Sequence, residues 1–278
     1  MFHSLTMIPI GLIRNWYLIR QMTWRDIAGR YKGSMIGVLW SFLTPLLMLT
    51  LYTLVFGVMF KVRWTSASPP GSSMQLGESP ADFALVLFVG LIMHSFMAEC
   101  MTRAPNLVIG NVNFVKRVVF PLEVLGWSVI TSALFHGAIS LIVLLLISII
   151  MHGTVPWTVV LLPLVLVPFA TLVLGLTWFL SATGVFVRDI GQAVQPLVTV
   201  LLFLSPILTP PSAVPEWLRP VLFLNPITVP VEQARALLIW GVLPDWWQLA
   251  AYSVVALLVA WAGALWFARC RPAFADVL

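Results

Sequence analysis

Four histidines, two cysteines and ten carboxylate side chains are the groups in this 278-residue chain that could perform acid–base, nucleophilic or metal chemistry. Cys100 and Cys270 have no second Cys or His at a metal-ligand spacing, so neither a disulfide framework nor a zinc site is predicted. His-Glu-x-x-His, Gly-x-Ser-x-Gly and Gly-Lys-Ser/Thr patterns are absent from the sequence. We therefore predict no catalytic residue, no metal and no cofactor in this chain, and no P-loop of its own.

Two histidines, His94 and His136, fall within long apolar segments. There they could relay a proton, as ionisable groups do in pumps and transporters. The alternative is a single histidine that is hydrogen-bonded to a neighbouring helix. The carboxylates lie at the ends of the apolar segments, whereas an ion-coupled transporter normally keeps ionisable groups near the middle of the bilayer. This pattern disfavours ion coupling.

Aromatic side chains offer a different chemistry. Many of the thirteen tryptophans lie near the ends of apolar segments, which is typical of interfacial anchors. A second group lies within the segments, where flat rings of little charge would let sugar rings slide past without tight binding. The alternative for this second group is again belt or packing residues. Its members are Tyr52, Phe56, Trp127, Trp178 and Phe186.

The elements that position these groups follow from composition. Hydrophobic residues make up 60% of the chain and charged residues 9%, and the mean hydropathy is +1.01. A soluble domain has about 25% charged residues, so composition excludes a water-soluble globular protein and predicts a polytopic membrane protein. A membrane-spanning helix needs about 20 mostly apolar residues. Six stretches are free of charges over a suitable length, at 33–60, 83–98, 124–151, 153–187, 190–215 and 249–268.

We therefore predict an all-α fold with six transmembrane helices in a single domain, 1–278. If both termini are cytoplasmic, most of the fifteen Lys and Arg residues lie on the inner side. Short cytoplasmic loops are enriched in these residues. The N-terminal residues lack the pattern of a cleaved signal peptide.

Three segments outside the spans have patterns of their own. Residues 12–32 predict an amphipathic interface helix with an apolar stripe of Leu12, Trp16, Ile19 and Ile27. Residues 103–118 predict a short cytoplasmic helix that begins near Pro105, the alternative being a plain loop. Residues 216–247 contain two short apolar runs, 220–231 and 236–244, which predict an external re-entrant helical hairpin between the fifth and sixth spans.

Shorter patterns predict local contacts. Asp26 and Arg30 have the spacing of an ion pair along one helix. Gly33 and Gly37 form a Gly-x-x-x-Gly pattern, and alanines repeat every fourth residue from 256 to 268. Such small residues let membrane helices approach closely.

Taken together, these residues resemble the ABC-2 type permeases that export polysaccharides such as O-antigen, capsule and teichoic acid. The strongest similarity is the basic and aromatic stretch before the first span, followed by Pro45. Three weaker similarities follow in the same order along nearly the whole chain. The four stretches are Arg25-Asp26 with residues 30–40, residues 116–123, Arg188-Asp189-Ile190 with Ser205-Pro206-Ile207, and Asn225-Pro226 with Glu232 and Arg235.

The resemblance implies a homodimer joined to two copies of a separate P-loop ATPase, which would bind ATP and Mg²⁺. The complex would lie in the bacterial inner membrane and export an isoprenoid-diphosphate-linked polysaccharide; no nucleic acid is implied. By this similarity 12–32 is the interface helix, 103–118 the coupling helix and 216–247 the gate helices. The coupling residues would be Arg103, Asn106, Asn111, Phe114, Lys116 and Arg117, and the gate residues Asn225, Pro226, Glu232 and Arg235.

On this basis the basic residues at the inner leaflet are expected to attract the carrier diphosphate, because clustered bases attract anionic head groups. These residues are Arg14, Arg25, Arg30 and Lys32. Two other classes stay open. An ion-coupled secondary transporter or lipid flippase would need no ATPase, and a membrane enzyme would need a polar site that these residues do not assemble.

Overall fold

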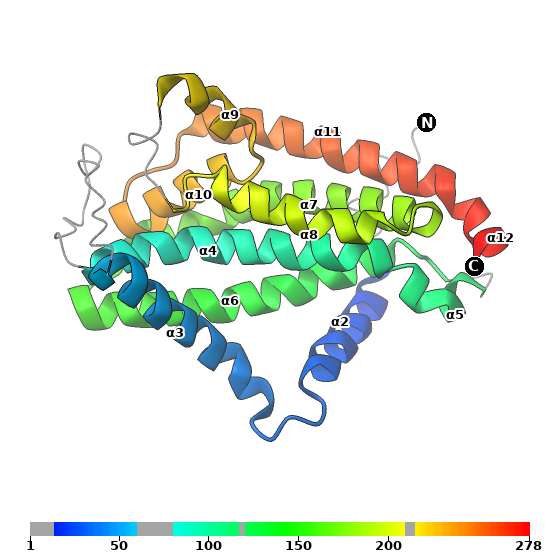
Figure 1. Cartoon of the computed structure of the whole chain (residues 1–278), viewed down its shortest axis with the longest axis horizontal. Helices are drawn as coiled ribbons and strands as arrows, with labels where there is room; N and C mark the ends of the chain where they lie inside the picture. The colour runs from blue at the N-terminus through cyan, green and yellow to red at the C-terminus, as the bar shows by residue number, and fades with distance from the viewer. Residues whose placement is uncertain (1–13, 60–79, 117–119, 209–214) are drawn as a thin grey trace.

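The structure is a computed structural model that describes residues 14–59, 80–116, 120–208 and 215–278. Within those ranges every regular element is a helix and no strand is present. The long helices run side by side along one direction, while α2 (Trp16–Tyr31) and α3 (Trp40–Tyr52) form a V-shaped arm that projects from the bundle (Figure 1). The prediction of an all-α fold is confirmed.

Four helical stretches of the described chain are long and apolar enough to cross a membrane, with 26 to 32 residues each. They correspond to four of the six predicted spans. The helices at their centre are α4 (Pro80–Arg103), α6 (Val124–His152), α7 (Leu162–Phe186) and α11 (Trp246–Cys270). The stretches themselves are Ala81–Asn106, Val124–His152, Trp157–Phe186 and Trp246–Val277.

The other two predicted spans are represented by shorter apolar helices, Trp40–Val55 and Ile190–Phe203. The first contains Pro45 in α3 and continues as the π-helical turn η2 (Thr53–Met59), beyond which the chain leaves the described residues. The second is α8 (Ile190–Phe203), which ends shortly before Pro206. A proline cannot donate the backbone hydrogen bond that a continuing helix needs. Six spans therefore remain a prediction.

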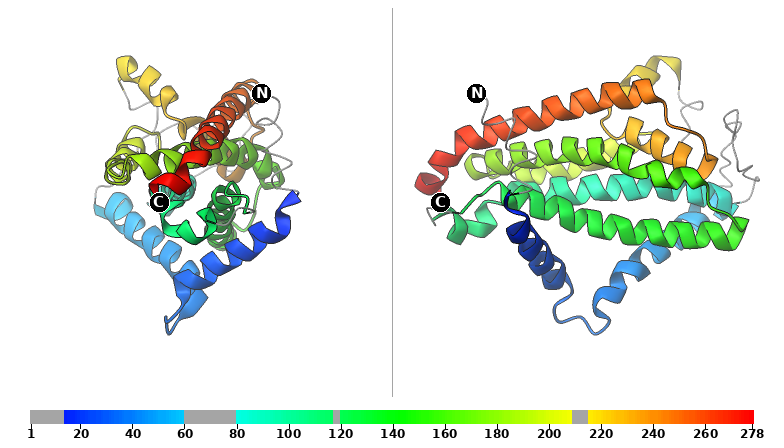
Figure 2. Two further views of the ribbon diagram at one scale, coloured as in Figure 1. Left: turned by 90° about the vertical axis from the view of Figure 1, so that its right-hand side faces the viewer. Right: turned by 180° about the vertical axis from the view of Figure 1, so that it is seen from behind.

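The turn between α2 and α3 contains both glycines of the predicted Gly-x-x-x-Gly helix contact. Gly33 has a φ of 84° and Gly37 a φ of 60°, values that only glycine adopts without strain. A Cβ atom added at either position would meet nothing within 4 Å. The prediction of a helix-packing motif here is wrong, because these glycines form the turn of the projecting arm that Figure 2 shows from two further sides.

Small residues do bring α7 and α11 into close contact. A Cβ atom at Gly263 would lie 2.1 Å from the backbone oxygen of Gly175, and one at Gly175 would lie 2.5 Å from Cα of Ala260. Ala256, Ala260 and Ala264 are buried along the same face. The predicted role of the alanine stripe in close packing is confirmed, and the helix it meets belongs to the same chain.

Replacing Gly263 with alanine is therefore expected to lower the stability of the bundle by about 1–3 kcal/mol, the usual cost of overpacking, because the obstacle is a rigid backbone. The apparent melting temperature of the detergent-purified protein measures this. Gly137→Ala in α6 is the matched control, since nothing lies within 4 Å of its added Cβ. Equal melting temperatures for the two variants would contradict the close contact.

Two short helices lie at the end of the bundle remote from the C-terminus, α9 (Arg219–Leu224) and α10 (Thr228–Arg235) (Figure 1). The break between them falls at residues 225–227, earlier than the two apolar runs predict. The reason is Asn225, whose Nδ2 donates to the carbonyls of Leu201 and Leu204 at 2.8 and 2.9 Å. This side chain caps the C-terminal carbonyls of α8. The π-helical turn η8 (Ala236–Trp240) follows α10.

Short helical turns complete the described chain. Three of them, η3, η4 and α5, connect α4 to α6 at the end of the bundle where the C-terminus lies (Figure 1). They are η1 (Gly37–Leu39), η3 (Ala104–Asn106), η4 (Ile109–Asn111), α5 (Val112–Val115), η5 (Trp157–Leu161), η7 (Glu216–Leu218), η9 (Arg271–Ala273) and α12 (Phe274–Val277).

Candidate functional site

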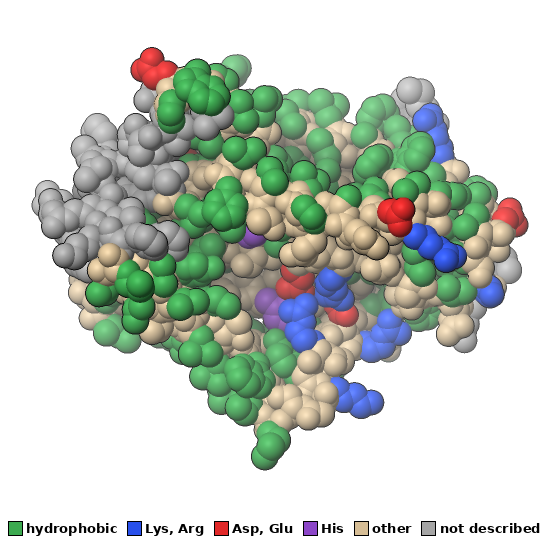
Figure 3. Space-filling model, in the orientation of Figure 1, with side chains coloured by type: hydrophobic (Ala, Val, Ile, Leu, Met, Phe, Trp, Pro, Cys, Tyr) green, Lys and Arg blue, Asp and Glu red, His purple; other side chains and the backbone are tan. Residues whose placement is uncertain are grey.

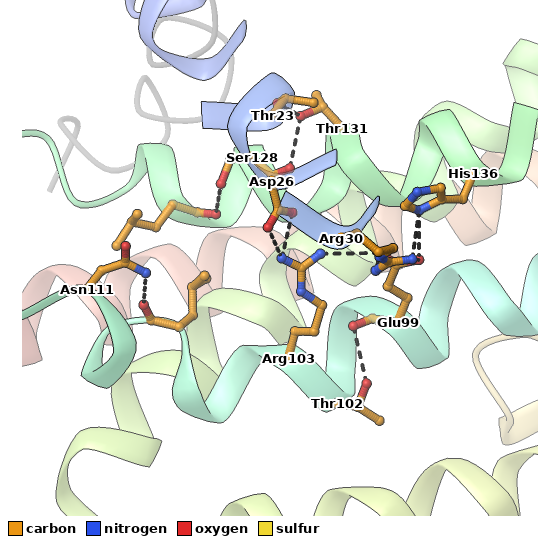
Figure 4. A network of polar contacts seen from close by, with 12 residues as sticks. Thr23, Asp26, Arg30, Glu99, Thr102, Arg103, Asn111, Ser128, Thr131 and His136 are labelled. Carbon is orange, nitrogen blue, oxygen red and sulfur yellow. Dashed lines mark hydrogen bonds and ion pairs between the residues drawn. The ribbon is translucent and has the colours of Figure 1, made fainter. Parts of the chain in front are cut away.

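A network of charged side chains joins α2 to α4 and α6, and Glu99 of α4 lies at its centre (Figure 4). Arg30 of α2 pairs with the Glu99 carboxylate, and His136 Nδ1 of α6 lies 3.2 Å from Glu99 Oε2. Arg103 Nη1 donates to Glu99 Oε1 at 3.3 Å, while its Nη2 donates to both carboxylate oxygens of Asp26 at 2.5 Å. Three helices are therefore held together by two guanidinium groups, two carboxylates and the imidazole of His136.

These contacts replace the ion pair predicted between Asp26 and Arg30 along α2. Asp26 binds Arg103 and Arg30 binds Glu99, so both pairs cross to α4. The side chain of Glu99 is only 16% exposed and therefore needs charged partners in place of water. The intrahelical prediction is wrong because it took α2 as an isolated surface helix, whereas Ile19, Met22 and Ile27 bury one of its faces.

Sequence reasoning did not single out Glu99 as a functional residue. The signal that could have found it is its place near the end of an apolar segment, because an ionisable group inside a membrane helix needs a specific partner. Both in-span histidines have such neighbours, since His94 Nε2 lies 3.1 Å from the carbonyl of Val198 in α8 and His136 contacts Glu99. Each histidine thus contacts a polar group of an adjacent helix. This is the arrangement given in the sequence analysis as the alternative to a proton relay.

The four basic residues expected to attract a diphosphate are not gathered at one point. Arg14 and Lys32 flank α2, whose 16 residues correspond to a length of about 24 Å. Arg25 lies over the ring of Phe114, with its guanidinium carbon 5.4 Å from the ring centre. Arg30 is engaged by Glu99. A single diphosphate could therefore reach only part of this set.

The segment expected to be a coupling helix consists of three consecutive short turns, η3, η4 and α5. Pro105 and Gly110 interrupt it, and both residues disfavour a continuous helix. The segment is fixed to the bundle at Gly184 of α7, where an added Cβ would lie 2.3 Å from the carbonyl oxygen of Pro105. Among the predicted coupling residues, Asn106 and Lys116 are exposed. Asn111 Nδ2 donates to the carbonyl of Leu107, and Phe114 stacks on Phe120. Arg117 lies outside the described residues.

The five in-span aromatic residues have different surroundings. Trp178 is 1% exposed and donates from Nε1 to the carbonyl of Glu123, a position that argues against a channel-facing role for its ring. Trp127 packs edge-on against Trp178 with ring centres 6.2 Å apart. Phe186 is exposed beside Phe274, and Tyr52 lines a cavity. The side chain of Phe56 lies outside the described part of the chain.

The gate residues form a tightly bonded structural unit. Arg235 is 1% exposed and donates from Nε to the carbonyl of Val86 at 3.0 Å. Its Nη1 donates to the carbonyl of Pro206 at 2.5 Å and to Glu232 at 2.9 Å, and its Nη2 to the carbonyl of Ile207 at 3.1 Å. Burial lowers the pKa of Arg235, and Glu232 opposes that shift. Pro226 accepts from the Tyr252 hydroxyl at 2.9 Å.

An all-helical bundle with several apolar helices of membrane-spanning length, tied together by partly buried ion pairs, defines the chain as an integral membrane protein. The family follows from its sequence: the model of the ABC-2 type transporter family matches residues 17–239, so the chain belongs to that family.

The chain is also similar to full-length relatives. It is 29% identical over 273 residues to the O-antigen export system permease protein RfbA of Myxococcus xanthus, covering 96% of this chain and 99% of that protein. It is 23% identical over 266 residues to the protein of the same name from Klebsiella pneumoniae, covering 94% and 95% of the two chains. These relatives are permease subunits of transporters.

Proposed function

We propose that this chain is the membrane subunit of an ATP-driven exporter that moves a lipid-linked polysaccharide of the O-antigen type out of the cytoplasm. The observation that carries this proposal is the near-complete alignment with relatives named for O-antigen export. The lack of a P-loop in the sequence agrees with a division of labour in which a separate subunit hydrolyses ATP. Two copies of this chain would join two copies of that ATPase.

In this proposal six helices span the inner membrane and both termini are cytoplasmic. The segment after α4, the helix α12 and the C-terminus lie at one end of the bundle, with α9 at the other (Figure 1). This arrangement supports a cytoplasmic face at the first end and an external face at the second. Residues 216–247 would then form the external re-entrant hairpin.

The turns from Ala104 to Val115 are the proposed docking element for the ATPase. They lie at the proposed cytoplasmic end, they expose Asn106 and Lys116, and they are held to α7 by the close contact at Gly184. Arg103 immediately precedes them and binds Asp26 of α2. A displacement of the docking element would therefore reach the interface helix through one guanidinium group.

The four basic residues in and beside α2 divide into two roles in this proposal. Arg14, Arg25 and Lys32 are exposed and would attract the anionic head group of an isoprenoid diphosphate at the inner leaflet. Arg30 would instead hold α2 to α4, since its guanidinium pairs with Glu99.

The proposal predicts a P-loop ATPase in a two-plus-two complex with this chain, and retention of finished glycan inside the cell when this chain is deleted. Gentle purification of the tagged chain from its native membranes, with mass spectrometry and subunit counting, tests the first outcome. Immunodetection of glycan on intact and permeabilised cells tests the second. Repeated recovery of this chain alone in an active state would contradict the proposal and favour a secondary carrier.

A further inference from the structure

A cavity of about 440 Å³ lies between the α2–α3 arm and the helices α4 and α6. Figure 3 shows this face hollowed at that place, with histidine and charged side chains in the depression. Its volume is within the range of pockets that hold small organic ligands, about 300–1,000 Å³. Aromatic rings and hydroxyl groups line it together. The rings are Tyr31, Trp40, Tyr52 and Phe88, and the hydroxyls include Ser41, Thr44, Ser95 and Ser140.

The charges at the inner end of the cavity cancel. Arg30 lines the cavity but pairs with Glu99, and Arg103 pairs with both Asp26 and Glu99. Two guanidinium groups therefore face two carboxylates. A phosphate or diphosphate would have to displace Glu99 from Arg30 and would then place a second anion beside a partly buried carboxylate, which costs free energy. The electrostatics favour an uncharged ligand.

His136 borders this cavity next to the ion pairs. Its Nδ1 lies 3.2 Å from Glu99 Oε2 and 3.1 Å from Arg30 Nη1, while its Nε2 is buried and has no hydrogen-bond partner in the described part of the chain. Arg30 can only donate, so Nδ1 accepts in that contact, whereas the contact with Glu99 needs Nδ1 to donate. The imidazole therefore belongs to the ion-pair network at the wall of the cavity, and the polar contacts with a ligand would come from the hydroxyl-bearing residues of the lining.

We propose that this cavity is a binding site for one or two uncharged sugar rings, which would bind through stacking on its aromatic side chains and through hydroxyl contacts with its serines and Thr44. The inference rests on the proposed function and adds the part of the substrate that is recognised. Flat aromatic rings provide apolar area with a polar rim, which suits the apolar face and hydroxyl edges of a sugar.

A second, apolar cavity shows by contrast which kind of ligand the first cavity suits. About 250 Å³ in volume, it is lined by apolar side chains of α4, α6 and α7, among them Val89, Phe96 and Leu166. Gly137 and Ala138 of α6 border it, whereas His136 and Ser140 of the same helix border the polar cavity. The two faces of one helix thus offer a hydrocarbon surface and a hydroxyl-bearing surface, and only the second matches a sugar.

Cysteine protection in the assembled complex tests the site. Ser140→Cys, combined with Cys270→Ser, places a thiol in the cavity, while the native Cys100 is fully buried. Membrane vesicles are prepared from cells that make the lipid-linked glycan and from cells whose first sugar-phosphate transferase is deleted. We expect a small neutral maleimide to label the introduced thiol about fivefold more slowly when glycan is present, which corresponds to a site that is about four-fifths occupied.

Ala138→Cys in the same Cys270→Ser background is the matched control on the other face of α6, and its labelling should not change. Equal labelling of the Ser140→Cys variant with and without glycan would overturn the site, as would a thiol that never reacts in the assembled complex. In glycan-free complexes, protection by inorganic pyrophosphate but not by a neutral trisaccharide would also overturn it. Intracellular glycan retention on deletion of this chain is measured separately, so failure of the site and failure of the exporter assignment are distinguishable.

Discussion

Replacing Arg235 with methionine is expected to lower the free energy of unfolding by about 4 kcal/mol and the apparent melting temperature by about 10 °C. The guanidinium group donates to the backbone carbonyls of Val86, Pro206 and Ile207, which belong to two separate parts of the chain. Methionine fills similar volume but leaves these buried carbonyls without donors. Each buried acceptor that loses its partner costs about 1–3 kcal/mol.

Two further variants separate the loss of geometry from the loss of charge. Arg235→Lys keeps a cation but loses the planar arrangement of donors, so an intermediate melting temperature is expected. Arg188→Met removes an exposed arginine and should leave the melting temperature unchanged. Fluorescence-detected size exclusion after heating measures all three in detergent. A melting temperature of Arg235→Met equal to that of the unmodified protein would show that the three carbonyls find other donors.

The membrane spans show how much of the fold can be predicted from the sequence. Apolar runs of sufficient length predicted four long helices, because burial from water and helix length impose strong, local constraints. The same criterion overestimated the helices at 33–60 and 190–215, where turns with positive φ at Gly33 and Gly37, and the end of α8 before Pro206, shorten the regular structure. A hydropathy pattern does not encode backbone conformation.

The partners of the polar side chains are harder to predict from the sequence than the membrane spans. The partners of Asp26, Arg30 and Arg103 are set by where α2 lies on α4 and α6, and no local spacing carries that information. The gate residue Arg235 was found through family resemblance, yet its structural role depends on carbonyls distant in sequence. Buried aromatic residues show the same limit, because position within a span did not reveal that Trp178 is enclosed.

Replacing Glu99 should distinguish a role in coupling ATP hydrolysis to export from a role in folding. Glu99→Leu would leave Arg30 and Arg103 close together without the carboxylate between them, and removing one member of a buried ion pair costs about 3–5 kcal/mol. Arg30 is 39% and Arg103 30% exposed, so solvent reduces the expected loss to about 2–3 kcal/mol. Glu99→Gln retains the shape and one acceptor oxygen, and it should fold with a smaller loss.

The informative variant is therefore Glu99→Gln, because a neutral amide holds Arg30 of α2 more weakly while Asp26 still binds Arg103. If the network transmits movement from the docking turns to α2, the reconstituted complex should hydrolyse ATP at the normal rate but export several-fold less glycan per ATP. Asp189→Asn, an exposed change at the same end of the bundle, should alter neither quantity. Should ATP hydrolysis and export fall together in proportion to the amount of folded protein, Glu99 would be a purely structural residue, since only a coupling residue changes their ratio.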